Sequence, residues 1–356
     1  MDSPFKFLEA YGPTDFDEFF GREKETAQLY NAVYASNLTL LYGASGTGKT
    51  SLVNCGLRNK FYYTEWLPVF VKRSDNINES LANALSVKLK ALEEVDDNPP
   101  EINNLVDLLD YLYLAYYKPV YLIFDQFEEL YISGSAAEQF EFYQSIKAIL
   151  DAGLQVKIIL IIREEWIAFL NNFEKVIPTL FDNRLRIERM TNRTIARVIL
   201  NTLNYHKIQL LEPKETIYAI IENLKDKEGI ALTNLQVYLD KLFQKQLQNQ
   251  KDSSAEKVVF SLSLVQEVGP MKNVLADFLE EQLLLLEEKL KKTRGIKNPK
   301  GIPTEILFAL VTDDHTKRSL NFKEIKEQLP RSLTISEADI SFCLDEFQRI
   351  RVLMRE

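Results

Sequence analysis

Short apolar runs alternate with longer amphipathic segments over the first half of the chain. The runs Leu38–Tyr42, Val120–Phe124 and Val156–Ile162 are apolar at nearly every position, a pattern typical of strands buried on both faces. Trp66–Val71 predicts a further strand. Between the strands, apolar residues recur at helical spacing over 23–34, 49–60, 79–92, 105–117 and 136–150. This alternation predicts an α/β fold, with a parallel sheet and helices on both faces.

From about residue 191 the spacing becomes almost wholly helical. Helices are expected over 194–203, 217–224 and 235–246 and after Gly269-Pro270, with a short extended piece over 258–264. The basic stretch 289–300 predicts a solvated linker between domains, with binding of an acidic partner as the alternative. Short helices over 306–312, 323–329 and 336–348, followed by the apolar residues 350–354, predict a winged helix whose wing has begun.

Composition narrows the class of protein. The formal net charge of −9 argues against a broad nucleic-acid-binding surface, which needs a positive field. Cys55 and Cys343 lie far apart, so neither a disulfide framework nor a cysteine zinc site is indicated. The first residues do not resemble a signal peptide, and the longest apolar run is too short to span a bilayer. A soluble, cytoplasmic protein without a membrane partner is therefore expected.

The segment that follows the first apolar run carries the strongest motif. Gly43-Ala44-Ser45-Gly46-Thr47-Gly48-Lys49-Thr50 fits the phosphate-binding loop pattern G-x-x-x-x-G-K-[S/T], and Ser51 follows it. The motif lies between a predicted strand and a predicted helix, the context that supports it. Glycines let backbone N–H groups point at phosphate oxygens, Lys49 can reach the outer phosphates, and the Thr50 hydroxyl can bind Mg²⁺. A nucleoside triphosphate or diphosphate is the expected ligand.

Three domains follow from these patterns. Residues 1–190 are expected to form an α/β P-loop nucleotide-binding domain, 191–300 a helical domain and 301–356 an incomplete winged-helix domain. Inside the first, Asp125 ends the buried strand predicted over 120–125, about 75 residues after Lys49, and is a second candidate Mg²⁺ ligand. Glu128 or Glu129 could polarise an attacking water, and we favour Glu128 as the base. The alternative is an acidic cap at a helix N-terminus.

An arginine ends the strand predicted over 156–162. Arg163 is expected to sense the γ-phosphate or to stabilise charge during phosphoryl transfer, because strand ends of this kind line the nucleotide cleft. An ion pair with Glu164 or Glu128 is the alternative. Arg184 and Arg186 are weaker candidates for an arginine finger. His315, in the segment 312–315, is expected to be a solvated surface residue.

Four segments together resemble the STAND ATPases, signal-transduction ATPases with numerous domains, and in particular their prokaryotic novel-STAND branch. They are Phe19-Phe20-Gly21-Arg22-Glu23, the loop Gly43–Thr50, Phe124-Asp125-Gln126-Phe127-Glu128-Glu129-Leu130, and Ile161-Ile162-Arg163-Glu164-Glu165-Trp166. Residues 4–8, 232–239 and 268–270 extend the likeness over nearly the whole chain. The resemblance implies that Phe20, Gly21 and Arg22 pass the adenine, and that the ligands are ATP or ADP with Mg²⁺.

The resemblance also implies a function. ADP would hold the domains of a regulatory switch closed, and ATP exchange on a signal would open it and permit homo-oligomerisation, with slow hydrolysis for resetting, often in antiviral defence. The chain departs from the pattern at 229–232, where members commonly carry a proline near the adenine. Because the usual C-terminal histidine segment, sensor repeats and effector are missing, we expect a fragment of a longer protein or partners in other chains.

The alternative functions are a DNA-associated ATPase and a small-molecule kinase. A DNA-associated ATPase similar to origin-recognition proteins would use the winged helix on DNA, but the predicted helix 336–348 carries Glu337, Asp339, Asp345 and Glu346, which repel phosphate. DNA is therefore not expected as a partner. A small-molecule kinase would need a substrate pocket and no helical tail.

Overall fold

The computed structural model describes residues 3–7, 9–93, 102–227, 229–250, 257–310, 320, 322–330 and 335–349. The chain divides into two compact units, residues 1–268 and 269–356. These units do not coincide with the three expected domains, whose boundaries stay a prediction. Within the described residues, none of the helices combines the length and the apolar character that crossing a bilayer requires.

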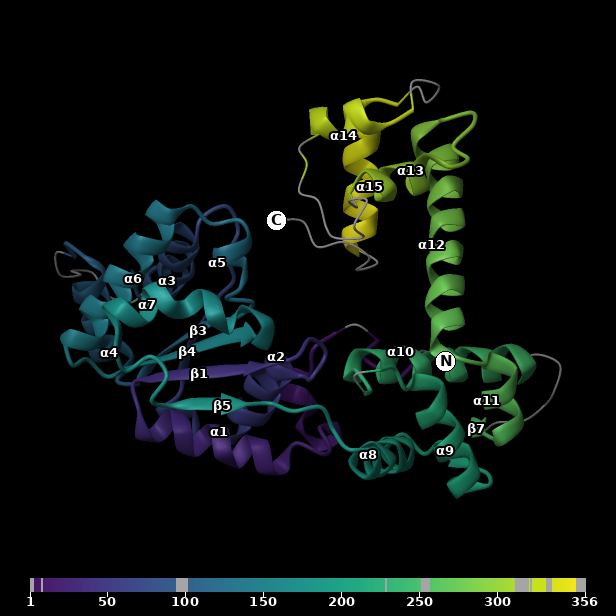
Figure 1. The fold of residues 1–356 in the computed structure, drawn as a ribbon, viewed down its shortest axis with the longest axis horizontal. Helices are drawn as coiled ribbons and strands as arrows, with labels where there is room; N and C mark the ends of the chain where they lie inside the picture. Colours follow the sequence, from purple (N-terminus) through teal and green to yellow (C-terminus); the bar gives the residue numbers. More distant parts are fainter. Residues whose placement is uncertain are drawn as a thin grey trace. The chain divides into compact units, whose positions relative to one another are not determined.

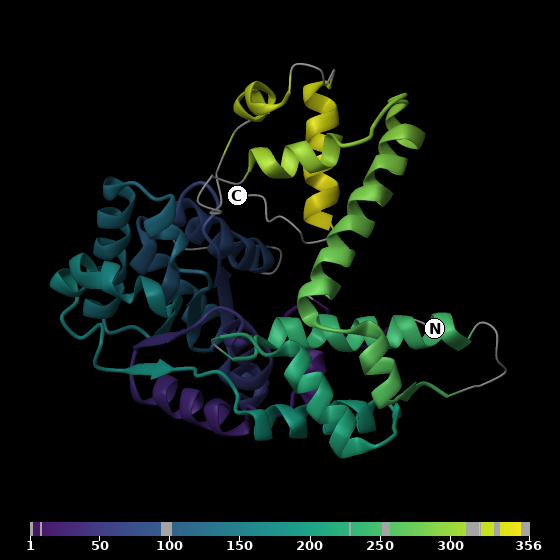
Figure 2. The ribbon, with the colours of Figure 1, turned by 45° about the vertical axis from the view of Figure 1, so that its right-hand side comes forward.

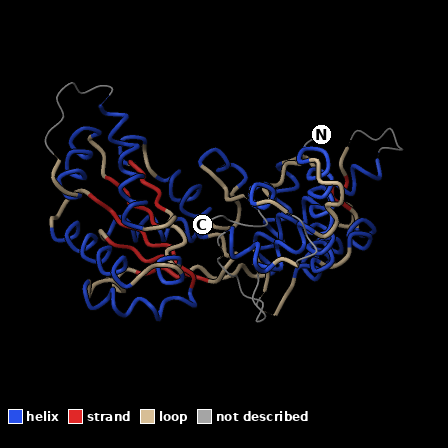
Figure 3. Tube along the Cα trace, turned by 90° about the horizontal axis from the view of Figure 1, so that it is seen from above, coloured by secondary structure: helices blue, strands red, loops and turns tan. Residues whose placement is uncertain are grey.

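A five-stranded parallel sheet lies at the centre of the first half of the chain (Figures 1 and 3). Its strands are β1 (Leu38–Gly43), β2 (Leu67–Val71), β3 (Val120–Phe124), β4 (Val156–Arg163) and β5 (Arg184–Arg186). They are ordered β2-β3-β4-β1-β5, so β4 lies between β1 and β3. All four neighbouring pairs are parallel, as the alternation of strands and helices predicts. The edge strand β5 was not predicted.

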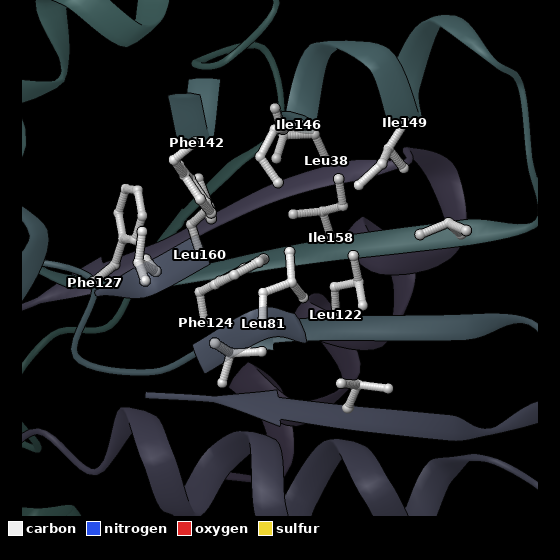
Figure 4. Close-up of a cluster of buried hydrophobic side chains, with 14 of the residues drawn as sticks. Leu38, Leu81, Leu122, Phe124, Phe127, Phe142, Ile146, Ile149, Ile158 and Leu160 are labelled. Atoms are coloured by element: carbon white, nitrogen blue, oxygen red, sulfur yellow. The ribbon is translucent and has the colours of Figure 1, made fainter. Parts of the chain in front are cut away.

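Successive strand residues point to opposite faces of the sheet and build two cores. On one face, Leu122, Phe124, Ile158 and Leu160 pack with side chains of α3 (Ile77–Glu93), α4 (Leu105–Tyr116), α6 (Ala136–Asp151) and α7 (Asn171–Val176), as Figure 4 shows in part. On the other face, Tyr121, Ile123, Ile159 and Ile161 pack with α1 (Glu23–Ala35) and with the helical segment 49–60. Helices therefore cover both faces, which confirms the predicted fold class.

The helical segment after the phosphate loop changes its winding twice. It starts as α2 (Lys49–Ser51), widens into a π-helix, η2 (Leu52–Leu57), and ends as a 3₁₀ turn, η3 (Arg58–Lys60), where one continuous helix was predicted. Gly56 permits close packing here, because a Cβ at this position would lie 2.6 Å from Oγ1 of Thr26 in α1. Leu52, Val53 and Leu57 of this segment are all buried.

Helices dominate residues 191–268, the remainder of the first unit (Figure 2). They are α8 (Asn192–Tyr205), α9 (Pro213–Leu224), α10 (Leu232–Gln250) and α11 (Leu262–Val268). The short strands β6 (Gln209–Leu210) and β7 (Val259–Phe260) pair in parallel. The extended piece expected over 258–264 is therefore shorter than predicted. The Ser261 hydroxyl accepts a hydrogen bond from the Leu264 N–H at 3.2 Å, which starts α11 instead.

Among its described residues, the second unit contains four helices: α12 (Met271–Arg294), α13 (Ile302–Ala309), α14 (Phe322–Gln328) and α15 (Glu337–Arg349). Leu290, Ile306, Ile325 and Phe347 belong to their shared core. The prediction of a linker starting at residue 289 is wrong, because α12 continues to Arg294. The predicted wing at 350–354 and the segment 312–315 with His315 lie outside the described residues, so the winged helix stays a prediction.

Candidate nucleotide-binding site

The phosphate loop joins β1 to α2 in the conformation that its glycines allow. Gly46 and Gly48 have φ values of 72° and 85°, in the left-handed region that favours glycine. The loop is closed internally by Thr47, whose hydroxyl donates to the Ala44 carbonyl at 2.9 Å. Ser45 lies exposed at the turn. The predicted loop residues Gly43–Thr50 thus form one compact turn at the start of a helical segment.

Lys49 folds back onto its own loop. Its Nζ donates to the carbonyl oxygens of Gly43 and Ala44, at 2.7 and 3.0 Å. Burial lowers the pKa of the Lys49 ammonium, and the nearby Glu128 carboxylate opposes that shift. The ammonium is therefore held at the loop, where it could exchange carbonyl oxygens for phosphate oxygens.

Thr50 and Asp125 meet across the ends of two strands. The Thr50 hydroxyl donates to Oδ1 of Asp125 at 3.0 Å, and Asp125 is only 5% exposed. A hydroxyl and a carboxylate are oxygen donors of the class that Mg²⁺ prefers, so these two residues fit the metal role expected of them. When bound, the ion would neutralise phosphate charge. Lys72, which no motif indicates, also lies here, with its Nζ 3.6 Å from Oδ2 of Asp125.

The chain after Asp125 crosses from β3 to the end of β4. Gln126 has a φ of 59°, uncommon for a residue other than glycine, and the Phe127 N–H donates to the Ile161 carbonyl at 2.9 Å. This turn brings Glu128 to Arg163. The Arg163 Nε lies 2.9 Å from Oε1 of Glu128, and the Arg163 N–H donates to Oε2 at 3.2 Å. The ion pair with Glu128, one of the alternatives at the sequence level, is therefore present.

Glu129, Arg163 and Arg186 are the other charged candidates for the site. Glu129 starts the short helix α5 (Glu129–Ile132) and is half-buried, whereas Glu128 is 2% exposed. Arg163 lies opposite Gly43 in the β1–β4 register, which places it beside the phosphate loop. Arg186 pairs with Glu164 at 3.0 Å and is 52% exposed. Which carboxylate acts as the base stays a prediction, and Glu128 lies beside Arg163, at 2.9 Å.

Arg22 is buried and ties three segments together. Its NH2 donates to the carbonyl oxygens of Thr47 and Glu188, at 2.8 and 2.9 Å, and its NH1 pairs with Glu25 at 2.6 Å. The preceding Gly21 has a φ of 84°, and a Cβ there would lie 2.6 Å from Val198. Arg22 therefore holds the phosphate loop against the segment that follows β5.

A pocket with an empty volume of about 640 Å³, part of it open to solvent, adjoins the phosphate loop. Its walls come from three segments: the chain before α1, the loop itself, and the residues from 190 to 236. The lining includes Phe7, Tyr11, Phe19, Phe20, Arg22, Gly46, Gly48, Ser51, Met190, Val198, Leu232 and Gln236. Aromatic and aliphatic walls next to a phosphate-binding turn suit the flat base of a nucleotide. Phe20 and Arg22 line this pocket, and their position beside the adenine stays a prediction.

Tyr11 and Gln236 are site residues that the motifs did not indicate. The Tyr11 N–H donates to the Ser51 hydroxyl at 3.1 Å, and its own hydroxyl accepts from Nε2 of Gln236 at 2.8 Å. The Leu232 N–H donates to the Gly46 carbonyl at 2.9 Å. These bonds connect the start of α10 to the phosphate loop at the place where the expected proline is absent. The aromatic run before α1 is the signal that could have pointed to Tyr11.

The strand order, the phosphate loop and the paired Thr50 and Asp125 define a P-loop nucleoside triphosphatase. The family model described as novel STAND NTPase 1 matches residues 4–354. The chain belongs to that family, as its motifs suggested. Among curated proteins, none matches the chain.

Solved structures share the fold. A Walker-type ATPase of Pyrococcus abyssi is 16% identical with a TM-score of 0.51, covering 98% of this chain and 95% of that chain. The Aeropyrum pernix ORC2 protein, solved with ADPNP and ADP, is 14% identical with a TM-score of 0.52, covering 98% and 100%. The Aeropyrum pernix ORC1 protein in complex with DNA is 15% identical with a TM-score of 0.51, covering 94% and 85%. At these identities the likeness shows a shared fold alone, so the expectation that DNA is not a partner stays a prediction.

Proposed function

We propose that this chain is an ATP- and ADP-binding switch with slow hydrolysis that controls the oligomerisation of a signalling or antiviral-defence protein. The observation that carries the proposal is the hydrogen bond from Leu232 in α10 to Gly46 in the phosphate loop. Phosphate would bind at the loop that contains Gly46, and Gly46 already contacts the first residue of α10. Nucleotide state and helix position are thereby coupled, as a switch requires.

The chemistry assigns each charged group a role. Lys49 and the N–H groups of the loop bind the phosphates, and Thr50 with Asp125 holds Mg²⁺. Glu128 is the general base for water, and Arg163 contacts the γ-phosphate after it separates from Glu128. While the ion pair at 2.9 Å persists, Arg163 occupies the Glu128 carboxylate that would accept a proton from water, so hydrolysis is slow. This pairing supports a regulatory role over metabolic turnover.

The output of the switch lies in other segments or other chains. Family resemblance supports sensor and effector parts that act in a longer protein or in trans, in the cytoplasm. Homo-oligomerisation on ATP binding is the step that would transmit the signal to them.

The second candidate function is a DNA-associated ATPase. The carboxylates of α15 argued against it, but two of them are neutralised within the second unit. Arg294 Nε lies 2.7 Å from Oδ1 of Asp339, and Lys289 pairs with Glu346. These pairs lower the negative charge that α15 would present to DNA, so the sequence argument against DNA is weaker than it appeared. A salt-dependent gel shift with duplex DNA tests this function, and tight binding at physiological salt would favour it.

Calorimetric titration of ATP and ADP tests the primary proposal. The Lys49→Ala variant should lose measurable affinity for both nucleotides, because it removes the cation that contacts the phosphates. Lys60→Ala, at the far end of the same helical segment, is the matched control and should bind as wild type. Unchanged affinity in Lys49→Ala would overturn the assignment of the loop.

The switch itself needs a second measurement. Hydrogen exchange at residues 232–236 and light-scattering mass should both differ between the ADP-bound protein and the ATP-bound Glu128→Gln protein. If nucleotide binds but exchange and mass are the same in both states, the chain binds nucleotide without acting as a switch.

A further inference from the structure

Lys72 lies at the magnesium-binding face of Asp125 because of strand register. β2 and β3 are paired in parallel with Val71 opposite Phe124, so the next residues along the two strands are neighbours. The Asp125 N–H donates to the Val71 carbonyl at 3.0 Å, which continues the ladder by one step. The Lys72 Nζ then lies 3.6 Å from Oδ2 of Asp125. The contact therefore follows from the backbone pairing of the sheet.

The residue after Lys72 fixes this part of the chain. Arg73 is 8% exposed, and its Nε lies 2.9 Å from Oε1 of Glu138, which is 5% exposed. Its NH2 also donates to the Asp75 carbonyl at 2.6 Å. Lys72 thus lies between a strand residue and an anchored arginine, while its side chain is 57% exposed and can move. A mobile ammonium on a fixed backbone can leave Asp125 without unfolding.

We propose that Lys72 is a competing cation that occupies Asp125 when Mg²⁺ is absent and leaves when the metal binds. The inference rests on the proposed function, in which Thr50 and Asp125 hold Mg²⁺. An ammonium at Oδ2 and a divalent ion on the same carboxylate repel each other, so a bound ion weakens the contact of Lys72 with Asp125. Lys72 neutralises the buried Asp125 in the metal-free state and so reduces its repulsion of nucleotide phosphates.

The consequence is a weaker dependence of nucleotide affinity on magnesium. Without Lys72, metal-free nucleotide would meet an uncompensated Asp125 and bind more weakly. With Mg²⁺ bound, loss of Lys72 removes a competitor, so affinity is unchanged or higher. The ratio of affinities with and without magnesium, which measures coupling between the two ligands, therefore rises.

Calorimetric titration of ADP in saturating Mg²⁺ and in EDTA measures this ratio without any turnover. In Lys72→Met the ratio should rise about two- to fivefold, the size that an ion pair with a partly exposed lysine supports. Lys72→Arg keeps the charge and should keep the wild-type ratio. Lys147→Met is the matched control, because Lys147 is 47% exposed and pairs with Asp151 at 3.0 Å on α6.

The outcomes separate this inference from the proposed function. A ratio in Lys72→Met that equals or falls below the wild-type value overturns the inference and indicates that Lys72 does not compete with the metal. An equal rise in Lys147→Met overturns it as well, because the effect would then come from general surface charge. Failure of the wild-type protein to bind ADP, or to respond to Mg²⁺, would instead contradict the proposed nucleotide site.

Discussion

The two ends of the parallel sheet are built from different chemistry. At the carboxyl ends, the strands lead into a glycine loop or a charged side chain: Gly43 at the end of β1, Lys72 after β2, Asp125 after β3 and Arg163 at the end of β4. Two of the three acidic residues in the segment Phe124–Leu130 are paired with a cation at the end of a neighbouring strand, Asp125 with Lys72 and Glu128 with Arg163. The charges at the carboxyl ends are therefore paired, and a bound ligand can replace one member of each pair.

At the amino ends of the strands, aromatic rings are found in place of charged side chains. Phe61 and Trp66 stack with ring centroids 4.7 Å apart, and Trp66 packs against Tyr121 at 4.3 Å. Burial raises the pKa of the Tyr121 hydroxyl. Lys118 extends the cluster, with its Nζ 3.3 Å from the centre of the Tyr63 ring. The amino ends of these strands are therefore held by aromatic packing and not by ion pairs that a ligand can replace.

The difference separates function from stability within one sheet. Ion pairs whose cation is partly exposed, as in Lys72 and Arg163, contribute little to folding, whereas a buried aromatic side chain contributes several kcal/mol. Substitutions at the carboxyl ends should therefore change nucleotide chemistry with small effects on folding. Substitutions at the amino ends should do the reverse.

The largest expected effect on chemistry comes from Glu128→Gln. Removing the proposed base should lower the ATP hydrolysis rate by about 100-fold or more, the range for loss of general base catalysis. Nucleotide affinity and the free energy of unfolding should change little. A steady-state phosphate-release assay with parallel calorimetry measures both.

Glu129→Gln is the matched control for that variant, since it removes a neighbouring carboxylate from the start of α5. Turnover near the wild-type rate is expected. If Glu129→Gln abolishes hydrolysis while Glu128→Gln does not, the base is assigned to the wrong residue.

The opposite end is tested by Trp66→Ala. Deleting a 3% exposed indole from the aromatic cluster should lower the free energy of unfolding by about 3–5 kcal/mol, as for other buried aromatic residues. Denaturant titration measures the loss, and ADP affinity of the folded fraction should stay at the wild-type value. Trp66→Phe should cost much less, because no described residue accepts a hydrogen bond from Nε1 of Trp66. A large change in ADP affinity in either variant would contradict the separation of the two ends.

The sequence predicted most of what local patterns determine. The boundaries of β1, β2, β3 and β4 each differ from the prediction by one residue, because these apolar runs have sharp ends. Thr50 and Asp125 meet as expected, since a P-loop and a strand-end carboxylate converge at one edge of a parallel sheet. The edge strand β5 was missed because two of its three residues are exposed arginines, which carry no strand pattern.

Contacts between distant segments could not be predicted. Tyr11 and Gln236 are separated by 225 positions, and their hydrogen bond depends on how the helical part packs on the phosphate loop. Lys72 meets Asp125 only because of the register between β2 and β3, which a single strand pattern does not reveal. The carboxylates of α15 were counted as free charge because their partners in α12 are far away in sequence.

The smallest predicted effect concerns a charge pair that lies near the carboxyl ends of the strands but stabilises the fold. Burial raises the pKa of Glu138, but hydrogen bonds from Arg73 and from the Ile77 N–H outweigh it, and the net pKa lies below its ordinary value of 4.5. A lowered pKa in the folded state stabilises the protein above the unfolded pKa, and this stability is lost as the pH falls through the lower, folded value.

Glu138→Gln should therefore lower the free energy of unfolding by about 1–3 kcal/mol at pH 7. The difference from wild type should shrink below about pH 4.5, as denaturant titrations at pH 7, 5 and 3.5 would show. Glu267→Gln, which removes an exposed carboxylate from α11, should show a much smaller difference at pH 7. A difference for Glu138→Gln that does not depend on pH would indicate that shape, and not charge, stabilises this corner of the sheet.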